Sequence, residues 1–72
     1  MELTIGEKVK VLMKRRGMTL AELAEATGQT RQNLSNKMSR DNFTERDAAS
    51  MAAALGCTFT PLFTMEDTGE AL

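Results

Sequence analysis

The sequence predicts a small, mostly helical domain of four helices followed by a short C-terminal β-hairpin. Four threonines each precede a segment with helical apolar spacing, and a polar residue three positions later can complete each helix cap. The pairs are Thr4 with Glu7, Thr19 with Glu22, Thr30 with Asn33, and Thr44 with Asp47. A length of 72 residues suits one domain without a separate catalytic or ligand-binding module.

Glycines and apolar spacing set the expected limits and faces of these helices. The first helix should end at Gly17, the second at Gly28 and the fourth at Gly56, because glycine adopts the positive φ of a helix end at low cost. A loop should follow the third helix at residues 41–42. The expected core residues are Ile5, Val9, Leu12, Met13, Leu20, Leu23, Ala24, Leu34, Met38, Ala48, Met51, Ala52 and Leu55. Phe43 should plug the core or staple the fourth helix.

The segment after Gly56 changes from helical to alternating apolar spacing. Phe59, Phe63 and Met65 alternate with threonines and Leu62, which favours a strand, a turn at residues 66–69 and a short returning strand. The alternative for residues 57–65 is a fifth helix, because Thr60-Pro61 is also a good helix start. We therefore divide the chain into a helical domain, residues 1–56, and a C-terminal hairpin, residues 57–72.

Composition excludes several classes of function. The chain contains no His and a single cysteine, Cys57, which excludes His-based general-base chemistry, a His–Cys zinc site and an intrachain disulfide. We expect no enzyme activity, no metal, no cofactor and no small-molecule ligand. No apolar run approaches the roughly 18 residues of a membrane span, and the N-terminus lacks the pattern of a signal peptide. We therefore expect a cytoplasmic protein without membrane contact.

The net charge of −1 conceals an asymmetry along the chain. Residues 1–46 hold all nine Lys and Arg against six acids, a net charge of +3, whereas residues 47–72 hold four acids and no base. Residues 26–40 contain three bases and no acid. This distribution indicates that one face meets an anion while the tail has a different task.

A tight turn at residues 26–30 separates the second and third expected helices. This is the layout of a helix-turn-helix, here spanning about residues 19–40. Ala24 suits the point where the two helices approach most closely, and Gly28 suits a turn position with positive φ. Leu34 then anchors the third helix on the core.

Between Thr4 and Gly56 the sequence resembles the helix-turn-helix domains of the Cro and phage-repressor type, the XRE family. The resemblance rests on Met18-Thr19-Leu20-Ala21-Glu22-Leu23-Ala24, Gly28, Thr30-Arg31-Gln32, Leu34-Ser35 and Ala53-Ala54-Leu55-Gly56. It implies sequence-specific binding of double-stranded DNA by a small transcriptional regulator, a repressor, with the helix at residues 30–40 in the major groove.

The chain departs from the family pattern at three places. Leu20 replaces a common Gln that often touches a phosphate, and Lys37 replaces an apolar residue, so its aliphatic stem should cover the core edge. Met13 and Met38 occupy the positions of a frequent Arg–Glu pair between the first and third helices. Loss of both charges removes two desolvation penalties together. The paired change therefore supports the match between these positions and the family pattern.

The third helix carries the expected DNA-reading residues on the side opposite Leu34 and Met38. Asn and Gln can bridge adenine N6 and N7, and Arg can do the same at guanine O6 and N7. The expected base contacts are Arg31, Gln32, Asn33 and Asn36. The expected backbone contacts are Arg16, Thr19, Thr30, Ser35, Lys37, Arg40 and Asn42, where Thr19 and Thr30 mark helix N-termini able to bind phosphate.

The acidic tail is expected to hold two copies together. Its residues Phe59, Leu62, Phe63 and Met65 present more apolar surface than a short hairpin can hide. A homodimer would set two recognition helices about 34 Å apart to read a palindromic operator. The alternative is a protein-interaction module, such as an antitoxin-like partner protein.

Overall fold

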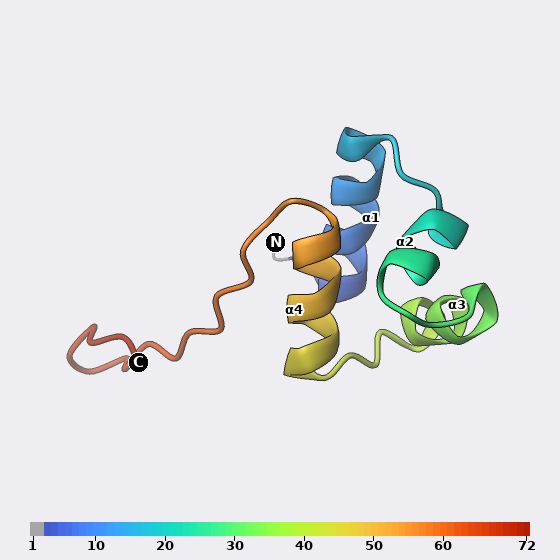
Figure 1. Ribbon diagram of the computed structural model, residues 1–72. Helices are drawn as coiled ribbons and strands as arrows, with labels where there is room; N and C mark the ends of the chain where they lie inside the picture. Colours follow the sequence, from blue (N-terminus) through green and yellow to red (C-terminus); the bar gives the residue numbers. More distant parts are fainter. Residues whose placement is uncertain (1–2) are drawn as a thin grey trace.

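Four α-helices form the body of the protein in the computed structural model, which describes residues 3–72 (Figure 1). The helices are α1 (Ile5–Arg16), α2 (Leu20–Ala26), α3 (Arg31–Arg40) and α4 (Glu45–Ala54). Helix α2 packs against α3, and α4 packs against both α1 and α2. The expected mostly helical, four-helix fold is therefore confirmed, with α2 and α3 forming the helix-turn-helix pair.

Each helix begins after the threonine that the sequence indicates. The side chains of Thr4, Thr19 and Thr44 accept a hydrogen bond from the backbone N–H three residues on, and the acid at that position accepts one in return. At the start of α3, Thr30 accepts from the backbone N–H of Asn33 at 3.0 Å. The Asn33 side chain instead turns back toward the preceding turn, so this cap is one-sided.

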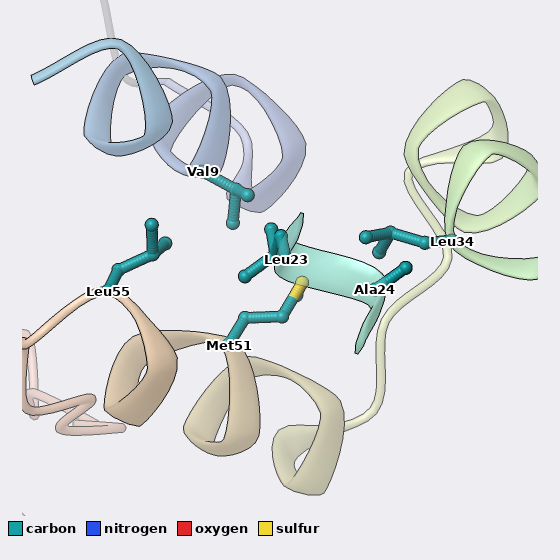
Figure 2. Close-up of a cluster of buried hydrophobic side chains, with 6 residues drawn as sticks. All are labelled: Val9, Leu23, Ala24, Leu34, Met51 and Leu55. Atoms are coloured by element: carbon teal, nitrogen blue, oxygen red, sulfur yellow. The ribbon is translucent and has the colours of Figure 1, made fainter. Parts of the chain in front are cut away.

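Six buried side chains form the core between the helices (Figure 2). They are Val9, Leu23, Ala24, Leu34 and Met51, which come from the four helices, and Leu55, the residue that caps the end of α4. Leu23 and Leu34 are completely buried, and Ala24 lies where α2 meets α3. Met13, Met38 and Phe43 pack at the edge of this cluster, as expected. Leu34 and, at the edge, Met38 thus hold α3 on the core and leave its opposite side to solvent.

The expected two-stranded hairpin at residues 57–72 is wrong. Within residues 3–72 no strand is present, and neither is the alternative fifth helix; the tail makes only an isolated antiparallel bridge between Thr64 and Ala71. Pro61 lacks an N–H for strand pairing, and a two-stranded hairpin is marginal without a surface to pack on. The tail has no such surface, because every residue from 60 to 72 is exposed.

Only the start of the tail contacts the body. Cys57 and Phe59 are half-buried beside α1 and α4, and we call the following residues, 60–72, the arm. The arm leads away from the helices on the side remote from α3 (Figure 1). The radius of gyration, 13.5 Å, exceeds the value of about 11 Å expected for a compact chain of this length. The arm is therefore an extension of the body rather than part of its core.

Candidate nucleic-acid interface

The turn between α2 and α3 is held by a relay of side-chain hydrogen bonds. The Asn33 amide donates to Gln29 Oε1 at 2.9 Å, the Gln29 amide donates to Thr27 Oγ1 at 2.8 Å, and that hydroxyl donates to the Leu23 carbonyl at 2.8 Å. Gly28 supplies the expected positive φ of +70°. The relay joins the end of α2 to the first turn of α3, and so fixes how Asn33 is presented.

The solvent side of α3 carries all four residues expected to contact bases. Arg31, Gln32, Asn33 and Asn36 are exposed, while Leu34 between them is buried. The Gln32 amide donates to Asn36 Oδ1 at 3.1 Å, one helical turn away. This contact aligns two amide groups along the helix, where each retains donors and acceptors for a base edge.

A hollow of about 500 Å³ lies between α3 and the start of α4. It brings together amide, hydroxyl and charged side chains from the end of α3, the connecting loop and the first turn of α4. The lining residues are Asn33, Asn36, Lys37, Arg40, Asn42, Thr44 and Asp47. Five of the residues expected at the interface therefore surround one depression on the α3 side of the molecule.

Lys37 pairs with Asp47, an acid whose sequence pattern indicates only a role in the cap of α4. Its Nζ lies 2.9 Å from Asp47 Oδ1, and both side chains are half-buried. Asp47 also accepts from the backbone N–H of Thr44 at 3.1 Å. The Thr44 hydrogen bond first, and then Lys37, hold the pKa of Asp47 below its ordinary range, against the opposing effect of desolvation. The pair ties α3 to α4 and fixes Lys37 at the wall of the hollow.

Four predicted backbone contacts lie outside this hollow: Arg16, Thr19, Thr30 and Ser35. Thr19 and Thr30 are exposed at the N-termini of α2 and α3, as expected. Ser35 lines a second hollow, of about 460 Å³, shared with Met13 and Met38 between α1 and α3. The two methionines thus lie on one α1–α3 groove, in agreement with their expected pairing.

Arg16 has a structural contact that the sequence did not indicate. Its Nε donates to the carbonyl of Leu55 at 2.9 Å, and its guanidinium lies against Gly56. This bond satisfies a carbonyl at the end of α4 and ties α1 to the point where the tail begins. A phosphate contact by Arg16 stays a prediction.

Sequence reasoning missed the pairing of Asp47 with Lys37 and the hydrogen bonds of Thr27 and Gln29. The spacing of Lys37 and Asp47 carries no local signal, because ten residues and a change of direction separate them. Thr27 and Gln29, in contrast, are polar residues inside the recognised turn, a place where such side chains commonly bond to neighbouring backbone. That composition could have identified the relay.

Neither a metal-binding cluster nor a membrane-spanning helix is found in the part of the chain that the structure describes. Residues 3–72 contain no group of three or more carboxylate, cysteine or histidine side chains arranged to hold a metal ion. Over the same range, no helix has the length and apolar character needed to cross a bilayer.

The sequence profile of the Cro/C1-type HTH DNA-binding domain matches residues 8–68. The chain belongs to this family. The match covers the helix-turn-helix and continues into the arm. It therefore extends beyond Gly56, where the resemblance noted in the sequence ends. Comparison with curated proteins and with solved structures gave no significant match. Family membership supports double-stranded DNA binding and a role in transcription regulation.

Proposed function

We propose that this Cro/C1-type protein is a sequence-specific transcriptional repressor that docks α3 in the DNA major groove. The observation that carries the proposal is the exposed, acid-free side of α3, which presents Gln32 and Asn33 in its first turn and Asn36 one turn later. Amide side chains recognise adenine through paired hydrogen bonds, and Arg31 at the first turn can read guanine. This set of amide and guanidinium groups therefore favours contact with base edges over contact with another protein.

Phosphate contacts would position the helix on the duplex. Lys37, Arg40 and Asn42 surround the hollow beside α3, and Thr19 and Thr30 mark helix N-termini whose free N–H groups favour anions. Asp47 does not oppose this role, because Lys37 neutralises its charge at close range. The proposed orientation therefore turns Arg40, Asn42 and the Lys37–Asp47 pair, whose charges offset one another, toward the DNA.

We further propose that two copies act together on a palindromic operator. The arm exposes Leu62, Phe63 and Met65, with exposed fractions of 62%, 81% and 47%, on a segment that carries three acids and no base. An acidic, apolar arm is unsuited to DNA but suited to a protein partner. This feature also favours the alternative of an antitoxin-like interaction module, which a stoichiometric second protein in the purified material would support.

Selection of bound sites from random duplex DNA, followed by a salt titration on the best site, tests the proposal. Each phosphate contact should contribute about −0.9 to the slope of log K against log salt. Arg40→Ala should make the slope shallower by about this amount, and Ser50→Ala, on exposed α4 surface, serves as the control. Failure to enrich a common sequence, or a flat salt dependence, would overturn the proposed function.

A further inference from the structure

The hydrogen-bond relay from the end of α2 to Asn33 can run in only one direction. It starts at the carbonyl oxygens of Leu23 and Ala24, which can only accept, and which take the single hydroxyl proton of Thr27 at 2.8 and 3.2 Å. The Thr27 oxygen can therefore only accept from Gln29, whose NH₂ group lies 2.8 Å away. Gln29 then faces Asn33 with Oε1, which accepts from the Asn33 NH₂ group at 2.9 Å. The backbone of α2 thus determines which way the Asn33 amide is turned.

The anchored end of the relay is shielded, and the end that can meet DNA is open. Thr27 and Gln29 are half-buried in the turn, whereas Asn33 is exposed on α3. Gln29 engages one N–H of the Asn33 amide, so the second N–H and the Oδ1 atom remain for a base. One donor beside one acceptor is the combination that pairs with N7 and N6 of adenine.

The amides of Gln32 and Asn36 lack such an anchor. Their bond of 3.1 Å joins one amide to another, and within residues 3–72 it is the only side-chain hydrogen bond that either makes. Rotation of both amides by half a turn would exchange donor and acceptor and keep the bond. These two side chains therefore retain a choice of polarity that the relay denies to Asn33.

The polarity of an amide matters at a base edge because adenine and guanine differ there in one group. Both present the N7 acceptor, but adenine adds the N6 amino donor and guanine the O6 acceptor. An amide that rotates freely can turn its NH₂ group to guanine O6 and keep one hydrogen bond. An amide held with its oxygen at that position faces O6 acceptor to acceptor, which leaves both groups unpaired at a cost in free energy.

We propose that Thr27 and Gln29 are positioning residues that fix the polarity of the Asn33 amide, so that Asn33 accepts adenine and rejects guanine at its base pair. Neither positioning residue needs to touch the DNA. This inference rests on the proposed docking of α3 in the major groove, and it gives the turn between α2 and α3 a part in base selection.

Thr27→Val and Thr27→Ser form a matched pair of variants. Valine keeps the shape of threonine without the hydroxyl, and serine keeps the hydroxyl. The Leu23 carbonyl retains the backbone N–H of residue 27 at 3.0 Å in both, so circular dichroism and urea denaturation should find both variants folded. Fluorescence anisotropy then compares the best selected site with adenine or with guanine at the pair where Asn33→Ala relaxes selection. The ratio of the two dissociation constants measures the preference.

The ratio for the unsubstituted chain should favour adenine at least about tenfold. Thr27→Ser should preserve this ratio. Thr27→Val should reduce it to less than about threefold, because the amides of Gln29 and Asn33 are then no longer tied to the backbone. An unchanged ratio in Thr27→Val, or an equal fall in both variants, would overturn the role of the hydroxyl.

Gln29→Glu and Gln29→Leu test the second link of the relay. A carboxylate can only accept, so it should still hold the NH₂ group of Asn33 and preserve the ratio, while its charge weakens binding to both sites alike. Leucine offers no acceptor and should reduce the ratio as Thr27→Val does. A lower ratio for Gln29→Glu than for Gln29→Leu would contradict the relay.

An Asn33→Ala background shows whether Thr27 acts through Asn33. There Thr27→Val should leave base preference unaltered, because the side chain that it positions is missing. An effect that persists in this background would mean that Thr27 acts through the fold, and the inference would fail. It would also fail, with DNA binding intact, if Asn33→Ala relaxed selection at no base pair of an enriched site. Failure to enrich any common sequence would instead overturn the proposed function, and this inference with it.

Discussion

The carboxylate of Asp41, at the end of α3, accepts a hydrogen bond of 2.7 Å from the backbone N–H of Gly6 in the first turn of α1. The two residues lie 35 positions apart. Asp41 adopts a left-handed conformation with φ +51°, unusual for a residue with a side chain, and this directs its carboxylate toward α1. The Asp41 carboxylate thus satisfies an N–H group at the N-terminus of α1. The same bond fixes the C-terminal end of α3, close to the proposed phosphate contacts.

Gly6→Ala tests this contact. An added Cβ would lie 2.8 Å from Asp41 Oδ1, too close for both groups to stay in place. We expect a loss of about 1 kcal/mol, because a charge-assisted hydrogen bond worth about 1.5–3 kcal/mol outweighs the helix propensity that Ala gains, about 1 kcal/mol. In an Asp41→Gly background this hydrogen bond is already absent, so Gly6→Ala should instead raise the unfolding free energy. Urea denaturation measures all four proteins, and destabilisation in both backgrounds would contradict the prediction.

Lys37 and Asp47 should make stability depend on pH in the acid range. The pKa of Asp47 is lowered in the folded protein, so its contribution is fully present above the ordinary Asp pKa and is lost as pH falls through the folded value. Unfolding free energy should therefore fall between about pH 5 and pH 2, and Asp47→Asn should flatten this part of the profile. Glu45→Gln removes a charge from the same helical turn without breaking these bonds. Equal flattening by both variants would exclude the Lys37 and Thr44 contacts as the cause.

Gln32 and Asn36 should determine base preference. Gln32→Ala and Asn36→Ala should each cost about 1–3 kcal/mol on the best site and relax selection at one base pair, whereas Arg40→Ala should weaken all sequences alike. The two amides share a hydrogen bond, so the double variant should cost less than the sum of the single variants. Fluorescence anisotropy on the best site and its single-base variants measures these effects. Uniform losses from all three substitutions would mean that α3 does not read bases.

Arg16 should act on stability rather than on DNA affinity. Arg16→Ala should lower the unfolding free energy by about 1 kcal/mol, because the Leu55 carbonyl loses its guanidinium donor and keeps only the weak thiol donor of Cys57. Arg16→Lys should not restore it, since lysine has no group equivalent to Nε. The salt slope of DNA binding should stay unchanged in both variants. A slope shallower by about 0.9 would instead assign Arg16 to a phosphate, as the sequence predicts.

The helical body and the residues on the outer side of α3 could be predicted from sequence because the relevant signals are local. A threonine cap, a glycine at positive φ and apolar spacing each act within one or two helical turns. Leu34 and Met38 together define the inward direction of α3, and the exposed positions of Gln32 and Asn36 follow from helical geometry. The same logic correctly placed Ala24 at the helix contact.

Contacts between distant segments were decided only by tertiary structure. Gly6 with Asp41, Lys37 with Asp47 and Arg16 with Leu55 each join different helices, and no short-range pattern encodes which surfaces meet. The arm failed as a predicted hairpin for a related reason. Alternation at residues 59–65 describes a strand that has a surface to cover, and a strand pair this short is not stable alone. Sequence alone therefore determined which faces of the helices are apolar or polar. Packing decided which polar groups pair between helices, and it left the apolar side chains of the arm exposed.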